Sequence, residues 1–162
     1  MNEASRAGLL LALSLACAGA GAAVTCRIGS GGGMAFGGYD VLSAAPDDSQ
    51  ARITTLCTRN GGSPNVTLTV QLSTGINGGS TNTRRMRNAV PGGGFLDYNL
   101  FRDVGRSAVW GFSSGVDTLS QTLSIPDRGS ATATFTIYGR IPALQDAAVG
   151  IYFDLVTVTV SP

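Results

Sequence analysis

Apolar and polar residues alternate one by one along most of the chain from Ile53 onward. A period of two residues is typical of a β-strand with one buried and one solvent-facing side. The clearest alternation spans residues 66–72, where every second residue is Val or Leu and the residues between them are Thr or Gln. Similar runs occupy residues 96–100, 119–125 and 132–137, and no window has the spacing of an amphipathic helix. We therefore predict a chain built from short strands.

The last apolar run, residues 151–160, changes phase partway along. Its first apolar residues are odd-numbered and the later ones are even-numbered, so the two sets would face opposite sides of one regular strand. The sets are Ile151, Phe153 and Leu155, followed by Val156, Val158 and Val160. An extra residue in the strand would bring both sets to the same side, and we predict a β-bulge here.

Glycine-rich segments separate the alternating runs. Residues 60–62, 75–79 and 91–94 combine Gly with Asn or Pro, which is the composition of tight turns. Residues 29–38 form a looser glycine-rich stretch, for which we expect a flexible connection. Many short strands joined by such turns favour an antiparallel β-sandwich over a parallel α/β sheet.

The beginning of the chain has a different composition. Arg6 precedes an apolar run, residues 9–16, which gives way to Ala and Gly up to Ala23. This order is typical of a secretory signal peptide, so we expect residues 1–23 to be removed, with cleavage after Ala22 or Ala23. A membrane anchor is the alternative, but half of the uncharged stretch is only Ala and Gly, whereas a spanning helix needs about 20 strongly apolar residues. A lipoprotein signal at Cys17 is disfavoured because Ser14 occupies the position where Leu is expected.

The remaining residues, 24–162, form one domain with few charges. All of its cations are Arg, all of its anions are Asp, and the net charge of the whole chain is +1. Near-neutrality argues against a nucleic-acid partner. Cys26 and Cys57 are the two cysteines left in this domain, and in an exported chain they predict a disulfide. Two cysteines without histidine cannot make a zinc site, so we expect no metal and no cofactor.

Three motifs could carry catalysis or phosphate binding, and each has a simpler interpretation. Residues 111–115 match the G-x-S-x-G pattern around Ser113, but a nucleophile elbow needs a histidine base and the chain has none. Residues 29–33 are glycine-rich yet lack the Gly-Lys-Ser/Thr ending of a phosphate-binding loop. The adjacent Asp47 and Asp48 are more typical of solvated loops than of a carboxylate pair. We predict no catalytic residues and no enzyme.

Arg84, Arg85 and Arg87 form a basic cluster. A polyanion site is one interpretation. We favour a second one, in which the three side chains lie at a sheet edge or pair with nearby Asp residues.

Several motifs together resemble the spore coat protein U domain family, the pilin-like subunits of archaic chaperone–usher pili. The most specific motif is Tyr138-Gly139-Arg140-Ile141-Pro142-Ala143, followed by Gly150, Tyr152 and Asp154 and then by a closing Val-Thr-Val-Thr-Val strand. Residues 84–86 with residues 96–103 are similar to a second block of the family pattern, and residues 108–111 agree as well. The resemblance extends over essentially all of residues 24–162.

The resemblance implies an incomplete immunoglobulin-like antiparallel β-sandwich of the pilin type, which lacks its last strand. The missing strand leaves an apolar groove that a periplasmic chaperone fills first and a neighbouring pilus subunit fills later. An outer-membrane usher is the further partner that the family implies. The expected groove edge is the final run, with Phe153, Leu155, Val156, Val158 and Val160, and the first strand near Cys26 lies across from it.

One feature departs from the family pattern. Polymerising subunits carry a donor segment of about a dozen residues ahead of the first cysteine, whereas the expected cleavage leaves only a few residues before Cys26. We therefore expect a tip or minor pilus subunit that accepts a donor strand and does not supply one. It would pass through the periplasm to a cell-surface pilus, with no membrane-spanning segment after cleavage. The alternative is a secreted surface-binding module or coat component that is complete without strand exchange.

Overall fold

The computed structural model describes residues 23–162, so the expected signal peptide lies almost wholly outside the described residues. This part of the chain contains nine β-strands and no helix. The strands are β1 (Ala23–Gly31), β2 (Asp47–Asn60), β3 (Asn65–Leu72), β4 (Arg84–Asn88), β5 (Phe95–Phe101), β6 (Leu119–Ser124), β7 (Ser130–Ile141), β8 (Tyr152–Phe153) and β9 (Val158–Ser161). The predicted all-β class is confirmed.

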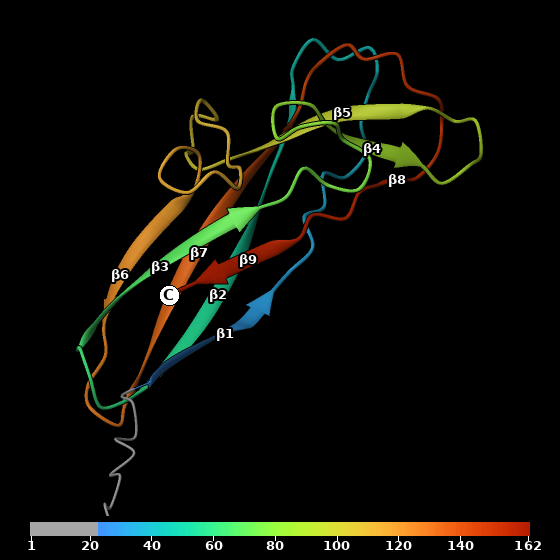
Figure 1. Ribbon diagram of the computed structural model, residues 1–162. Helices are drawn as coiled ribbons and strands as arrows, with labels where there is room; N and C mark the ends of the chain where they lie inside the picture. Colours follow the sequence, from blue (N-terminus) through green and yellow to red (C-terminus); the bar gives the residue numbers. More distant parts are fainter. Residues whose placement is uncertain (1–22) are drawn as a thin grey trace, which may run out of the picture.

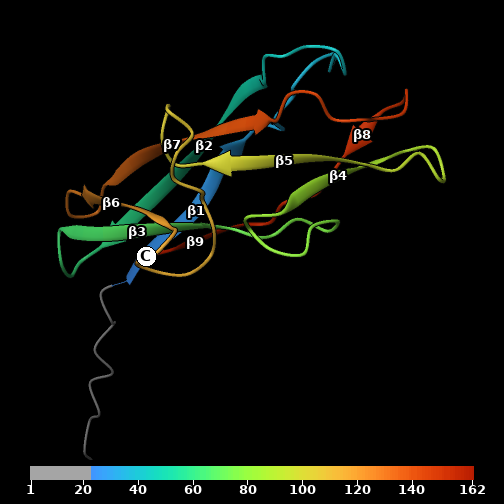
Figure 2. The ribbon, with the colours of Figure 1, turned by 90° about the horizontal axis from the view of Figure 1, so that it is seen from above.

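The strands form two antiparallel sheets that face each other (Figure 1). The larger sheet has the order β1-β2-β7-β5-β4-β8, and the smaller one has the order β6-β3-β9. Seen from above, β3 and β9 cross over β1 and β2 (Figure 2). The antiparallel sandwich predicted from the short strands and glycine turns is confirmed.

The core lies between the sheets, where the inward sides of the alternating strands meet. Leu68, Val70 and Leu72 of β3 are fully buried, opposite Phe135 of β7, which is 2% exposed. Trp110 fills the space between them, because its indole ring meets Phe135 edge-on and its Nε1–H donates to the Val70 carbonyl at 2.9 Å. The polar residues between the apolar ones face outward, and the Thr67 and Thr122 hydroxyls form a hydrogen bond across β3 and β6.

The glycine segments form the predicted turns. Residues 60–62 connect β2 to β3, and Gly61 and Gly62 have φ values of 79° and 75°. Side chains rarely adopt this left-handed backbone conformation, whereas glycine does so without steric cost. Residues 91–94 likewise connect β4 to β5, with Gly92 at φ 81°.

The predicted bulge in the final run is wrong. From Tyr152 to Val160 the even-numbered residues all face inward without a change of phase, and Ile151, Phe153 and Leu155 stay 75%, 50% and 65% exposed. The chain accommodates them by dividing the run between the two sheets. β8 pairs with β4 of the large sheet, whereas β9 pairs with β3 of the small one. The outward apolar residues lie at this crossing and not in one continuous buried strand.

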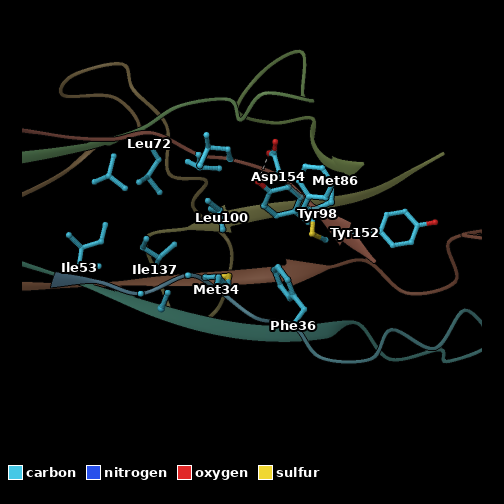
Figure 3. A pocket seen from close by; sticks show the side chains of 18 residues that line it. Met34, Phe36, Ile53, Leu72, Met86, Tyr98, Leu100, Ile137, Tyr152 and Asp154 are labelled. Atoms are coloured by element: carbon cyan, nitrogen blue, oxygen red, sulfur yellow. Dashed lines mark hydrogen bonds between the residues drawn. The ribbon is translucent and has the colours of Figure 1, made fainter. Parts of the chain in front are cut away.

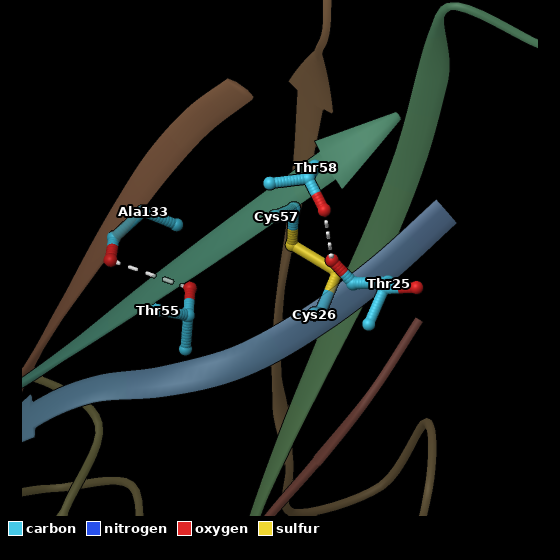
Figure 4. The surroundings of a disulfide bond; sticks show 6 residues. All are labelled: Thr25, Cys26, Thr55, Cys57, Thr58 and Ala133. Carbon is cyan, nitrogen blue, oxygen red and sulfur yellow. Dashed lines mark hydrogen bonds between the residues drawn. A yellow bond between two sulfur atoms is a disulfide. The ribbon is translucent and has the colours of Figure 1, made fainter. Parts of the chain in front are cut away.

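The predicted disulfide between Cys26 and Cys57 is confirmed (Figure 4). The two residues are direct partners in the β1–β2 ladder, with their Cα atoms 4.1 Å apart. Cys57 is fully buried in the core, whereas Cys26 is only partly buried. The disulfide therefore fastens β1, which is an edge strand, to the interior of the sandwich.

Candidate functional site: an open groove between the sheets

β1 and β9 are the edge strands of the two sheets on the same side of the sandwich, and they lie beside each other (Figure 1). They run in opposite directions. β1 pairs only with β2, and β9 pairs only with β3. Within residues 23–162, no backbone hydrogen bond joins β1 to β9. Each strand thus has one row of backbone N–H and C=O groups without a partner strand.

The inward side of β1 is only partly covered by protein. Ile28 lies directly opposite Thr55 in the ladder, and directly opposed residues face the same side of a sheet. Thr55 is fully buried, yet Ile28 is 45% exposed. Val24 and Cys26 share this side and are also only partly buried against the core. Apolar side chains that face inward and still contact solvent indicate a sandwich that is open along β1.

β9 shows the same pattern from the other sheet. Val158 and Val160 lie opposite Leu72 and Val70 of β3, which are both fully buried. The two valines, and Val156 before them, are nevertheless only partly buried. All three valines therefore lie along the open edge of the small sheet, and their role as the edge of a donor-strand groove stays a prediction. Phe153 and Leu155 border the same opening, but their exposed side chains face away from the core.

A cavity of about 490 Å³ opens between these two edges (Figure 3). Leu72 reaches toward it from the small sheet, while Ile53 and Ile137 reach toward it from the large sheet. A second cavity, of about 760 Å³, continues between residues 34–41 and 147–152. The two cavities share Met34, Phe36, Met86 and Tyr152 as lining residues, so they form one long groove. We refer to the opening from Val24 to Phe36 on one side and from Tyr152 to Val160 on the other as the edge groove.

Asp154 holds the crossing segment between β8 and β9 at the side of the edge groove. Its carboxylate accepts hydrogen bonds from the Tyr98 hydroxyl at 2.7 Å and from the Ile76 backbone N–H at 3.0 Å. Asn77 donates to the same carboxylate through its backbone N–H and its side-chain amide. Burial, together with the hydrogen bond to Asp154, raises the pKa of Tyr98 well above its ordinary value, so the phenol stays a donor. Asp154 is therefore a structural anchor for this wall of the groove.

The Tyr-Gly-Arg-Ile-Pro motif supports the opposite wall. Met34 and Phe36 pack so closely on Gly139 that a Cβ atom there would clash with both side chains. Pro142 offers its carbonyl to the Tyr39 hydroxyl at 2.8 Å, which fixes the chain beyond the groove wall.

The rest of the motif also packs or pairs within the sandwich. Ile141 is buried, and Tyr138 lies beneath the guanidinium of Arg106. Arg140 donates two hydrogen bonds to Asp48, at 2.7 and 2.8 Å, and this contact lowers the pKa of Asp48.

Two further motif residues position the loop ahead of β8. Gly150 lies against the Asn88 side chain, with no room for a Cβ atom. The Tyr152 hydroxyl donates toward the carbonyls of Gly93, at 3.2 Å, and Ala148, at 2.8 Å. The family motif thus shapes the edge groove and carries no reactive group.

One arginine of the basic cluster is buried and the other two are exposed, which the sequence did not indicate. Arg84 is fully buried, and its guanidinium donates to the carbonyls of Leu72, Ser73, Thr81 and Trp110 and to the Asn99 side chain. Burial lowers the pKa of Arg84. The favoured interpretation, an exposed edge or pairing with Asp, is wrong for this residue.

Arg85 and Arg87 face the solvent on the outer side of β4. Arg85 lies 4.2 Å above the Phe95 ring and donates to the Asn77 carbonyl. Neither of these two arginines has an ion-pair partner within residues 23–162.

The candidate catalytic motifs occupy ordinary structural positions. Residues 111–115 form a loop before β6 in which the Ser113 carbonyl accepts from the Val116 and Asp117 backbone N–H groups, and no helix follows as an elbow requires. Residues 29–33 are not simply a flexible connection, because residues 29–31 belong to β1 and residues 31–33 line the edge groove.

Nowhere in residues 23–162 do three Cys or Asp side chains lie close enough together to hold a metal ion. The same residues include no helix with the length and hydrophobicity needed to cross a membrane.

The chain is similar to a known protein family and to a known protein. A family model described as the Spore Coat Protein U domain matches residues 12–159. The chain is also similar to Protein U of Myxococcus xanthus, with 32% identity over 149 residues that cover 84% of this chain and 76% of the relative.

Proposed function

The chain belongs to the spore coat protein U domain family, and from that premise we propose that it is a structural subunit of an archaic chaperone–usher pilus that accepts a donor strand in its edge groove. The family is one of structural pilus and coat domains, not of enzymes. The observation that carries the proposal is the row of inward-facing apolar side chains on β1 and β9 that are only partly covered, with Ile28 45% exposed opposite a fully buried Thr55.

An inserted strand would satisfy both edges at once. It would pair its backbone with β1 on one side and with β9 on the other, and its alternate side chains would cover the exposed valines. Since β1 and β9 run in opposite directions, the inserted strand is parallel to one of them and antiparallel to the other. Burial of apolar area, which contributes about 25 cal/mol per Å², would favour this association.

The proposed position is at the tip or among the minor subunits. β1 begins at Ala23 and is committed to its own sheet through the ladder with β2 and the disulfide. If the expected signal peptide is removed, little chain remains ahead of β1 to fill a neighbour's groove. The partners are then a periplasmic chaperone, an outer-membrane usher and one donor subunit, and the destination is the cell surface.

A second candidate is a coat component that works without strand exchange. The description of the matching family model, which names a spore coat, favours it. In that case the edge groove would remain open in the mature protein or would be covered by coat material. The two candidates differ in whether a strand in the groove stabilises the domain.

A self-complemented fusion tests the proposal. β9 runs antiparallel to β1 and ends beside it, so a short Gly/Ser turn after Pro162 can lead a strand of about ten residues back along the groove, some 33 Å at about 3.3 Å per residue. A donor with alternating Val and Thr should raise the denaturant midpoint and the soluble yield of residues 24–162. The matched control carries the same residues in an order without alternation. Equal midpoints for the unfused protein, the control and the alternating donor would exclude strand acceptance.

A further inference from the structure

Three glycines at the border of the edge groove have no explanation within the chain itself. Gly31, Gly32 and Gly33 line the 490 Å³ cavity, and a Cβ atom at any of them would meet no atom within 4 Å. None of the three is among the glycines with positive φ. Neither crowding nor backbone conformation therefore requires glycine at these positions, in contrast to Gly139, where a Cβ atom would clash with Met34.

Gly31 stands where an inward side chain would be expected. It lies directly opposite Ile53, which is 3% exposed and faces the core. Directly opposed residues face the same side, so Gly31 continues the inward row of Val24, Cys26 and Ile28. The inward row of β1 therefore has no side chain at residue 31, beside the part of the cavity that Ile53 lines.

The cavity beneath these glycines is large and mostly apolar. Ile53, Leu72, Leu100 and Ile137 form its interior, and the carboxylate of Asp154 is held by its own hydrogen bonds at the side. A volume of about 490 Å³ is far more than a valine side chain fills. Farther along, Val160 and its neighbours on β9 occupy the groove with their own side chains.

Resting on the proposed strand acceptance, we propose that Gly31–Gly33 form an entry point through which the donor strand inserts one large aromatic or branched apolar side chain into this cavity. A glycine in a strand often marks a place where another backbone approaches closely. Because Gly31 carries no side chain on the inward side, the space beside Ile53 stays open, and a large side chain of a donor strand paired with β1 can reach the core between the two sheets. The valines on β9 then contact smaller donor residues.

The first experiment moves one Phe along the donor of the fusion described above. Each variant carries Phe at a different inward position and Val at the others, and the measurement is the denaturant midpoint. Because the donor returns antiparallel to β9, its early positions lie near Val160 and its late positions lie near Val156 and Gly31. We expect the largest rise in midpoint for a late Phe and a smaller rise, or a fall, for an early one.

The second experiment fills the entry point from the subunit side. Gly31→Val should leave the midpoint of the unfused protein unchanged or raised, because its side chain enters open space beside Ile53. In the fusion with a late Phe, Gly31→Val should remove the rise in denaturant midpoint that the Phe gives. Replacing that Phe with Ala in the Gly31→Val fusion should then recover part of the lost midpoint. Ser30→Val is the matched control, since Ser30 lies opposite Thr54 on the outer side. It should leave both proteins unchanged.

The outcomes separate the two proposals. If every Phe position gives the same midpoint while the non-alternating donor still gives no gain, strand acceptance holds and the entry point is refuted. The entry point is equally refuted if Gly31→Val and Ser30→Val act alike in the fusion. If no donor stabilises the protein, the proposed strand acceptance itself is refuted.

Discussion

At the scale of single residues, Arg84 fixes the geometry of the sandwich around one end of the groove. Its guanidinium connects the end of β3, through Leu72 and Ser73, to β5 and to the loop at Trp110. All of its partners are neutral oxygens, so the buried cation depends on a complete set of hydrogen bonds. The period-two pattern places residue 84 on the same side as Met86, but it could not show that an arginine would be buried there.

Replacing Arg84 with Lys should lower the free energy of unfolding by about 2–4 kcal/mol. Lysine has three donors on a point charge, so two or three buried carbonyls would lose a partner at about 1 kcal/mol or more each. Urea denaturation measures the loss. Arg85→Lys, one residue along on the exposed side, serves as the control and should change stability by no more than about 0.5 kcal/mol. Similar losses for both variants would contradict the role assigned to Arg84.

Cys26→Ser should reduce stability by about 3–4 kcal/mol, as the chain-entropy model gives for a closed loop with a sequence separation of 31 residues. The loss of order should be greatest in β1 itself, because β1 is an edge strand and the disulfide fastens it to the core. Denaturation reports the loss, and thiol titration of the denatured wild-type domain should find no free thiol. Cys17→Ser, in the segment expected to be removed, should change neither measurement. Two titratable thiols in exported protein would contradict the pairing.

At the scale of elements, the final apolar run shows both the reach and the limit of sequence patterns. The valines at positions 156, 158 and 160 were placed correctly on one inward side, because alternation determines which residues share a face. The odd-numbered apolar residues wrongly predict a bulge, because an alternation pattern is interpreted on the assumption that the whole run is one strand in one sheet. The chain instead changes sheets between β8 and β9, a tertiary feature that no local alternation encodes.

A charge at Val158 tests whether this element is the wall of the acceptor groove. Val158→Asp should abolish the gain in midpoint that the alternating donor gives to the fusion, because an unpaired carboxylate buried under the donor costs several kcal/mol. The unfused protein should lose less, since Val158 is only partly covered there. Thr159→Asp places the same charge on the outer side and should preserve the gain. Loss of the gain in both variants would indicate general damage to β9.

At the scale of the whole molecule, the fold class and the disulfide followed from the sequence, and the strand phases did so largely as well. The donor-strand groove and its valine edge are expected from the resemblance alone and stay a prediction, whereas the structure shows that β1 and β9 are edge strands. The sequence could not show that residues 29–31 belong to β1, because glycine has a low strand preference and a glycine run is typical of a loop. Nor could it show that the Tyr-Gly-Arg-Ile-Pro motif supports the groove wall, since its contacts with Met34 and Tyr39 are distant along the chain.

The division of the C-terminal run between the two sheets also has a consequence for the order of events in folding. Arg87 pairs with Phe153, and Val70 pairs with Val160, so each sheet receives an edge strand from a segment that is synthesised long after its partner. Pairings over such long sequence separations form slowly. During that interval the apolar sides of β3 and β4 are open to misassociation. The period in which the chain most needs protection from misassociation would therefore begin during its synthesis, before the edge groove itself exists.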